Sequence, residues 1–186
     1  MATTETAPAE LRALLLGHIR DVPDHPIAGV TFKDITPLLA DPVAFDALVG
    51  ALATLCTRHA ATKVAGLEAR GFILAAPAAA RARLGFVPVR KAGKLPGPTI
   101  AQTYELEYGS AEVEIHRDAF TAHDRVLVID DVLATGGTAE AAVELVRRSG
   151  ATVAGVAVLL ELGFLGGRQR LTRALAGVPL DALVTL

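Results

Sequence analysis

Val126-Leu-Val-Ile-Asp-Asp-Val-Leu-Ala-Thr-Gly-Gly-Thr138 is the stretch of this sequence that decides its fold. It opens with an uninterrupted apolar and mostly β-branched run, residues 126–129, which is typical of a strand buried on both faces of a parallel sheet. It closes with a loop of small residues, and an alanine-rich helical segment follows at residues 139–148. A buried strand, a short loop and a helix in this order predict an α/β fold with a central parallel β-sheet flanked by helices.

The loop of this stretch is a candidate phosphate site. The first N–H groups of a helix have no partner within the helix, and the helix dipole favours an anion at that end. Gly136 and Gly137 allow the backbone to approach a ligand closely, and Thr135 and Thr138 add hydroxyl donors. We therefore expect the loop, which begins at Ala134, to surround a phosphate group.

Two carboxylates, Asp130 and Asp131, stand immediately before that loop. They would repel a bare phosphate, but they accept hydrogen bonds well from the hydroxyls of a sugar. A ribose 5-phosphate meets both conditions, with Asp130 and Asp131 on its 2′ and 3′ hydroxyls and the loop around its 5′-phosphate. Two adjacent Asp residues alone would fit a solvated strand end better, but the order of the whole stretch favours a binding site.

Length and composition limit the class of protein. The chain has 186 residues, of which 52% are hydrophobic and only 4% aromatic, so we expect one domain with a core of aliphatic side chains. The net charge of −2 argues against nucleic acid or a membrane surface as a partner. Cys56 falls in a helical apolar pattern and is expected to be buried. Residues 1–10 lack the features of a signal peptide, and no apolar run approaches the ~18 residues of a membrane span. A cytoplasmic protein is expected.

Helical and strand-like segments alternate along the chain, as in a parallel sheet with helical crossovers. Residues 1–10 are expected to be a disordered leader, and residues 21–29 to be irregular because they hold two prolines and a glycine. Asp41-Pro42 predicts a helix start, with an N-cap acceptor followed by proline. Further strands are expected at 63–67, 86–90, 152–160 and 180–186, and further helices at 11–19, from about 71 to 83, and at 168–176.

Residues 91–118 interrupt this alternation. A loop rich in glycine and proline occupies residues 91–98. Residues 104–108 and 111–115 then alternate with period two around Gly109-Ser110, which predicts a β-hairpin with charges on one face. An antiparallel hairpin inserted between parallel strands is a candidate flexible flap.

The stretch around Asp130 closely resembles the phosphoribosyl diphosphate (PRPP) signature of the type I phosphoribosyltransferases. Residues 29–39, 66–72, 90–98 and 106–109 resemble the adenine phosphoribosyltransferase family, so the resemblance runs in order from about Asp24 to Gly167. It implies a Rossmann-like type I fold with an antiparallel flap or hood. It also implies the conversion of adenine and PRPP to AMP and diphosphate with Mg²⁺, and commonly a homodimer.

The departing diphosphate needs cations beside it. Arginine offers a fork for paired phosphate oxygens, and lysine supplies a movable point charge. The segment 68–71 resembles the family's diphosphate loop, which implies a cis peptide bond between Glu68 and Ala69. No His or Cys cluster has metal-ligand spacing, so no protein metal site is expected and PRPP would hold the Mg²⁺. The diphosphate candidates are Glu68, Ala69, Arg70, Arg90, Lys91 and Lys94.

The hairpin supplies a candidate catalytic carboxylate. Closure of a lid can bring a carboxylate to the cationic C1′ centre or to the proton of adenine. The residues alone do not separate Glu107 from Glu105; the resemblance selects Glu107. Tyr108 beside it could hydrogen-bond or seal the lid, and Arg70 is the third catalytic candidate. The remaining hairpin glutamates, Glu105, Glu112 and Glu114, are expected to face solvent.

Adenine needs a pocket that stacks its ring and reads its nitrogens. Phe32 is a candidate for stacking, although core packing explains it nearly as well, and the resemblance assigns backbone contacts to Thr31 and Lys33. Val132 and Leu133 are expected to form the apolar floor. Two alternatives stay open: a PRPP-dependent transferase for another purine or for a pyrimidine, and a non-catalytic PRPP-sensing regulator. A dinucleotide-binding module is weaker, because no G-x-G-x-x-G motif follows a strand.

Overall fold

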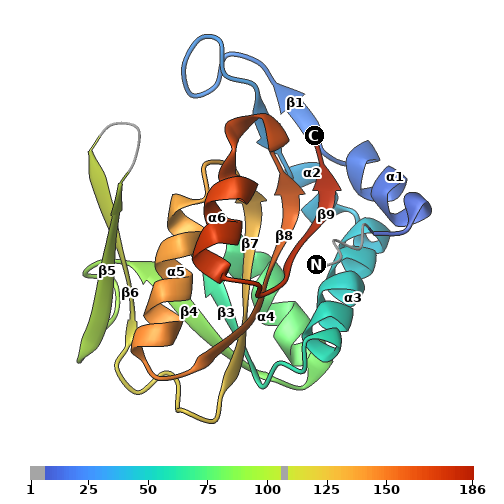
Figure 1. Ribbon diagram of the computed structural model, residues 1–186. Helices are drawn as coiled ribbons and strands as arrows, with labels where there is room; N and C mark the ends of the chain where they lie inside the picture. The colour runs from blue at the N-terminus through green and yellow to red at the C-terminus, as the bar shows by residue number, and fades with distance from the viewer. Residues whose placement is uncertain (1–6, 106–108) are drawn as a thin grey trace.

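The computed structural model describes residues 7–105 and 109–186, and a seven-stranded sheet forms its centre. The strand order is β5-β6-β4-β3-β7-β8-β9 (Figure 1). The five strands from β4 to β9 in this order pair in parallel, and β5 and β6 pair antiparallel at the β4 edge. The strands are β3 (Lys63–Leu67), β4 (Gly85–Lys91), β5 (Thr99–Glu105), β6 (Ser110–His116), β7 (Arg125–Leu133), β8 (Thr152–Glu161) and β9 (Leu180–Thr185).

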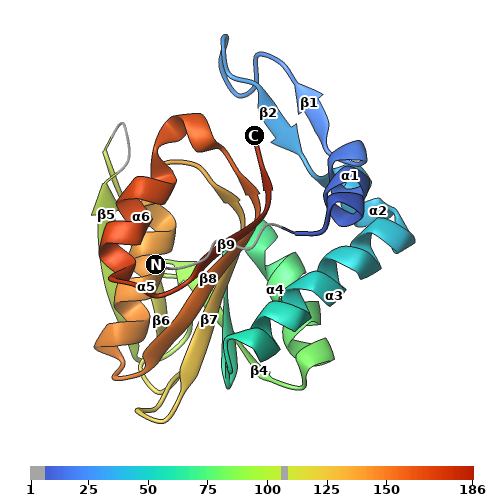
Figure 2. The ribbon, with the colours of Figure 1, turned by 45° about the vertical axis from the view of Figure 1, so that its right-hand side comes forward.

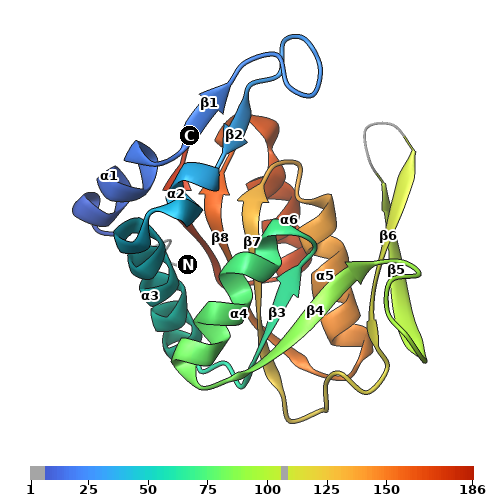
Figure 3. The same cartoon turned by 180° about the vertical axis from the view of Figure 1, so that it is seen from behind.

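Helices cover both faces of the sheet. Helices α3 (Pro42–Arg58) and α4 (Arg70–Ala82) lie on one face, and α5 (Gly137–Arg148) and α6 (Gly167–Leu175) lie on the other (Figure 3). Side chains alternate along β7, so that Val126 and Val128 pack toward α5 while Leu127 and Ile129 pack toward α3 and α4. This architecture confirms the predicted parallel α/β fold.

The N-terminal segment forms a small hood beyond the carboxyl ends of the parallel strands (Figure 2). It contains α1 (Ala9–Gly17), the antiparallel pair β1 (Arg20–Val22) and β2 (Phe32–Asp34), and α2 (Thr36–Ala40). Two predictions need correction here. Residues 9 and 10 belong to α1 rather than to a leader, and the segment predicted to be irregular begins with part of β1.

The predicted start of α3 is confirmed. The Asp41 carboxylate accepts hydrogen bonds from the amides of Val43 and Ala44 at 3.0 and 2.8 Å, which satisfies two free N–H groups of the first turn. Cys56 is buried on this helix, and burial raises the pKa of its thiol to about 11. The thiol is therefore a core group and not a nucleophile.

The β5–β6 hairpin packs against the core of the protein through residues of β6. Val113 and Ile115 of β6 are buried in the core shared with α5, and β5 runs beside α5 (Figure 1). The Arg148 guanidinium at the end of α5 donates to the carbonyl of Ala101 at 2.6 Å. Glu114 is only 5% exposed, so the expectation that it faces solvent was wrong.

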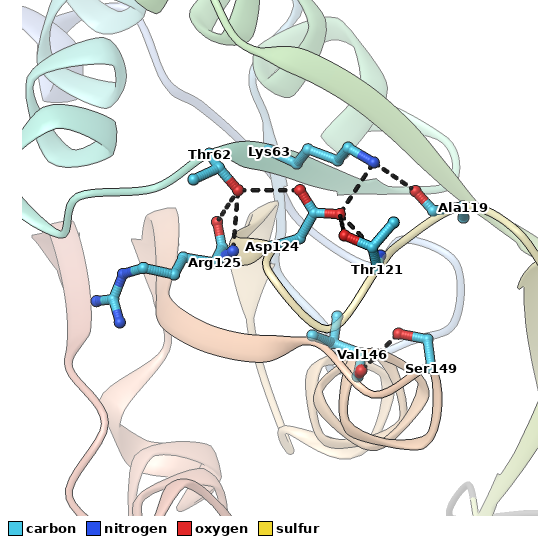
Figure 4. Close-up of polar contacts among 8 residues, drawn as sticks. All are labelled: Thr62, Lys63, Ala119, Thr121, Asp124, Arg125, Val146 and Ser149. Atoms are coloured by element: carbon cyan, nitrogen blue, oxygen red, sulfur yellow. Dashed lines mark hydrogen bonds and ion pairs between the residues drawn. The ribbon is translucent and has the colours of Figure 1, made fainter.

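A polar network joins the starts of β3 and β7, at the end of the sheet opposite the hood (Figure 4). The Asp124 carboxylate accepts hydrogen bonds from the amide and hydroxyl of Thr121 and from the hydroxyl of Thr62, and it pairs with Lys63 at 3.1 Å. Burial raises the pKa of Asp124, but these bonds outweigh it and lower the pKa to about 2. Within the described ranges, no helix is both long enough and apolar enough to cross a membrane.

Candidate active site

The predicted site residues meet at the carboxyl edge of the sheet. The turn after β3, the loop after β4 and the loop after β7 all emerge there, because parallel strands end at one edge. The hood lies beyond this same edge of the sheet (Figure 2).

The loop after β7 has the geometry expected of a phosphate site. Gly136 adopts φ +85°, in the left-handed region that favours glycine, and it is the N-cap of α5. No side chain in the described part of the chain caps the first turn of α5, so its leading N–H groups face the loop. Thr135 is exposed at the loop and Thr138 is half-buried beside it.

A second backbone segment supports this loop from behind, and it could not be predicted from local sequence. Gly167, the first residue of α6, lies so close that a Cβ on it would overlap the carbonyl oxygen of Ala134. A Cβ on Gly136 would lie 2.9 Å from the carbonyl oxygen of Gly167. The two backbones therefore touch, and glycine at 167 permits the contact. The sequence shows only the pair Gly166-Gly167, which by itself indicates a turn.

The two carboxylates lie together at the end of β7. Asp131 is 6% exposed and forms an ion pair with Arg70 at 2.7 Å, and Asp130 accepts a hydrogen bond from the amide of Asp131 at 2.9 Å. Burial and the adjacent charge of Asp131 raise the pKa of Asp130 well above its ordinary value. Burial also raises the pKa of Asp131, although Arg70 opposes the rise. Adjacent carboxylates with shifted pKa values, of which Asp131 lines a cavity, are typical of a functional site.

The predicted diphosphate residues form a connected group. The peptide bond between Glu68 and Ala69 is cis, as predicted. The Glu68 carboxylate accepts from the Arg90 guanidinium at 3.1 Å and from the amide of Lys91 at 3.0 Å. Burial raises the pKa of Glu68, but these bonds outweigh it and lower the pKa. Glu68 therefore orients the Arg90 guanidinium and holds the backbone at Lys91.

An apolar cavity of about 230 Å³ lies between the hood and the end of the sheet. The predicted residues Thr31, Phe32, Lys33 and Val132 line it, together with Arg70 and Asp131. The Arg70 guanidinium lies 4.9 Å from the centre of the Phe32 ring, so Phe32 faces the site and is not core packing. The Lys33 ammonium turns away to Asp21 at 2.7 Å.

The predicted floor needs one correction. Leu133 is buried in the core against α5 and does not line the cavity, because neighbouring residues of a strand point to opposite faces. Of the two predicted floor residues only Val132 lines the cavity, and Leu160 pairs with it in register on β8. The period of two in β7 could have excluded Leu133. Sequence reasoning also missed the apolar lining residues Val30, Ile35, Leu160, Leu162 and Leu165.

The predicted catalytic residues Glu107 and Tyr108 lie outside the described residues. The last described residues before them lie beside the phosphate loop. A Cβ on Gly137 would be 3.3 Å from both the carbonyl oxygen of Glu105 and the ring of Tyr104. Among residues 7–105 and 109–186, no three His, Cys, Asp or Glu side chains are grouped to hold a metal.

Comparison with known proteins agrees with this geometry. A family model described as phosphoribosyl transferase domain matches residues 44–171. The adenine phosphoribosyltransferase of Streptomyces coelicolor is 69% identical over 181 residues, which cover 97% of this chain and 100% of that protein. The adenine phosphoribosyltransferase structure from Rhodothermus marinus superimposes with a TM-score of 0.89 at 48% identity, covering 96% of this chain and 100% of that one. The structure of the Saccharomyces cerevisiae adenine phosphoribosyltransferase, solved with adenine and an imino-altritol bisphosphate, superimposes with a TM-score of 0.88 at 37% identity. The match covers 95% of this chain and 99% of that one.

An acidic pair placed before a phosphate loop, on this sheet, defines the chain as a phosphoribosyltransferase. The sequence identity and coverage shared with the relatives above identify the family within this class. The chain belongs to the adenine phosphoribosyltransferase family.

Proposed function

We propose that this protein transfers the 5-phosphoribosyl group from PRPP to adenine, giving AMP and diphosphate in purine salvage. One observation carries the proposal: Asp131 and its partner Arg70 line the apolar cavity together with Phe32, and Ala134, where the phosphate loop begins, lines it too. A sugar-phosphate and a flat apolar base therefore have adjoining places. The yeast relative solved with adenine and a bisphosphate supports this pairing of ligands.

The acidic pair and the loop hold the ribose 5-phosphate in this proposal. Asp130 and Asp131 accept hydrogen bonds from the 2′ and 3′ hydroxyls. The 5′-phosphate lies on the free amides at the start of α5. Thr135 and Thr138 add hydroxyl donors, and Ala134, Gly136 and Gly137 supply backbone that a phosphate can approach closely.

The leaving diphosphate lies near Arg70 and the loop after β4. Arg90 is already oriented by Glu68 at 3.1 Å. Within the described part of the chain, no carboxylate lies within ion-pair distance of the ammonium groups of Lys91 and Lys94, although the charge of Lys91 helps to lower the pKa of Glu68. Both groups can therefore meet an anion. These cations stabilise the negative charge that grows on the diphosphate as its bond to C1′ breaks.

The acidic pair does not form a metal site by itself, and this fits a Mg²⁺ ion that arrives bound to PRPP. Asp131 is already paired with Arg70, and the raised pKa of Asp130 makes that carboxyl a poorer ligand for a cation. The oxygens of PRPP and water would hold the metal, and its contribution is to neutralise charge on the leaving diphosphate.

Adenine stacks on Phe32 and rests on Val132, with the backbone of Thr31 and Lys33 reading its edge. The apolar side chains that complete this cavity exclude water from the base. Glu107 and Tyr108, from the flap, complete the site: the Glu107 carboxylate steadies the cationic C1′ centre or accepts the proton that adenine loses.

The state of the protein in the cell is part of the same proposal. We infer a single domain that works as a homodimer, since Val43 and Ile73 on α3 and α4 are large apolar side chains exposed by 67% and 44%. Light scattering after size exclusion tests this. We infer a cytoplasmic location, because PRPP is too highly charged to cross a membrane unaided.

Mass detection of AMP from adenine, PRPP and Mg²⁺ tests the proposed reaction. Hypoxanthine, guanine and orotate serve as competing acceptors, and omission of the metal tests the need for Mg²⁺. We expect AMP from adenine in the complete mixture and little nucleotide from the other bases. Transfer to one of them instead, or PRPP binding without transfer to any base, would contradict the proposal.

A further inference from the structure

We propose that Glu114 is a positioning residue that fixes the loop after β4, and thereby sets Lys91 and Lys94 against the diphosphate of PRPP. The inference rests on the proposed function, and it assigns a task to a buried carboxylate outside the cavity and the phosphate loop. Glu114 lies on β6 of the hairpin and is 5% exposed.

The backbone partners of this carboxylate belong to the loop, and the side chain of Thr99 at the start of β5 adds a hydrogen bond from outside it. One carboxylate oxygen, Oε1, accepts hydrogen bonds from the amide of Lys94 at 2.9 Å and from the amide of Leu95 at 3.0 Å. Burial raises the pKa of Glu114, but the amides of residues 93–95 outweigh it and lower the pKa. The buried group is therefore an anion whose charge is satisfied by the loop backbone.

A second set of bonds holds the same loop from the other side. Arg90 is the register partner of Glu114 across β4 and β6, and its guanidinium donates to the carbonyl of Lys94 at 3.2 Å. The same guanidinium binds Glu68, whose carboxylate also accepts from the amide of Lys91. Two carboxylates and one arginine thus fix the backbone at both lysines.

The loop needs such support because of its composition. Gly93 and Gly97 adopt φ +77° and +85°, and a glycine-rich loop has many conformations when it is free. A loop that is already ordered loses less entropy when an anion binds to it. Glu114 therefore acts on PRPP affinity without contacting PRPP.

Kinetics of Glu114→Gln and Glu114→Ala test this claim. The amide oxygen of Gln can still accept from the loop, whereas Ala removes both bonds. We expect Glu114→Ala to raise KM for PRPP about tenfold, Glu114→Gln to raise it less, and KM for adenine and kcat to stay within about twofold. Glu112→Gln is the matched control: Glu112 lies on the same strand and is exposed, and among the described residues its carboxylate accepts only from the hydroxyl of Thr103, while its contact with the loop is made by the backbone carbonyl and survives the substitution.

Hydrogen exchange gives a readout that does not depend on activity. The amides of Lys94 and Leu95 should exchange slowly in the unmodified protein, and fast in Glu114→Ala while the amides of α5 stay protected. An unchanged KM for PRPP, or fast exchange at both amides before any substitution, would overturn the inference. A parallel loss of kcat and of both affinities with a lower Tm would do the same. Failure of the unmodified protein to make AMP would count against the proposed function, and the exchange experiment would still decide the contact.

Discussion

The guanidinium of Arg70 lies 2.7 Å from the Asp131 carboxylate, and the same group lies 4.9 Å from the centre of the Phe32 ring. One cation thus contacts both Asp131, which is proposed to bind the ribose, and Phe32, which is proposed to stack on adenine. Its position at the start of α4 follows from the turn after β3, which brings it to the end of β7. The proposed ribose and adenine subsites therefore meet around one side chain.

Arg70→Gln should weaken PRPP binding. The lost charge-assisted bonds correspond to about 1.5–3 kcal/mol, or roughly a 10- to 100-fold rise in KM for PRPP. Steady-state kinetics with PRPP varied at saturating adenine measures this. Arg81→Gln is the control, because Arg81 lies on the same helix but pairs with Asp46 away from the site. Equal KM values in the two variants would exclude Arg70 from PRPP binding.

Asp130→Asn should stabilise the free protein while it damages binding. The pKa of Asp130 is raised in the fold, so ionisation opposes folding increasingly as pH rises from its unfolded value through the folded one. Asn carries no charge to bury, so the variant should melt about 2–4 °C higher at pH 8 and equally at pH 4. KM for PRPP should rise at least about tenfold.

Melting curves at the two pH values, with Asp118→Asn as an exposed control, measure the effect. A lower Tm for Asp130→Asn at pH 8 would mean that the carboxylate is stabilised where it lies, contrary to the argument.

Gly167→Ala should distort the phosphate loop from behind. Alanine is the better helix former, so propensity alone predicts a small gain in stability. The structure predicts a loss of about 1–3 kcal/mol, because the added Cβ would overlap the carbonyl oxygen of Ala134. Calorimetric titration with ribose 5-phosphate should show weaker binding. Gly17→Ala is the control, since no atom lies within 4 Å of the added Cβ; indistinguishable affinities would refute the contact.

Asp124 should govern part of the acid stability. Its pKa is lowered to about 2, so its contribution is complete above the unfolded value of about 4 and is lost as pH falls from about 4 to about 2. The contribution is at most about 2 kcal/mol. Urea unfolding of the protein and of Asp124→Asn should differ at pH 6 and converge near pH 2. A difference that stays constant over this range would show that the carboxylate charge is not responsible.

Glu107→Gln should slow turnover by about 10²–10⁴ if Glu107 acts in acid–base chemistry. KM for PRPP should stay nearly unchanged, because the proposed function assigns the ribose and its phosphate to other residues. Single-turnover kinetics isolates this step, with Glu105→Gln as the neighbouring control. An unchanged rate would remove Glu107 from the mechanism.

The elements of the sheet could be predicted because their patterns are strong. The run at 126–129 and the strand at 63–67 are buried in parallel pairing as expected, and Asp41 caps α3 as its type and place suggested. The first helix begins two residues inside the predicted leader, since local composition does not show that α1 packs against α3 and β9.

The parts of the site that were missed depend on tertiary contacts. Glu114 reads as one of several charged hairpin residues, and only the position of the loop after β4 turns it into a buried anion. Gly167 lies far along the chain from Ala134, so its contact with the phosphate loop has no local signal. Leu162 and Leu165 reach the apolar cavity because the chain turns back after β8.

A crystal structure with ribose 5-phosphate bound tests the central claim most directly. The account predicts the carboxylates of Asp130 and Asp131 within hydrogen-bond distance of the 2′ and 3′ hydroxyls, and the phosphate on the amides of residues 135–138. A phosphate bound elsewhere, with both carboxylates turned away from the sugar, would contradict it.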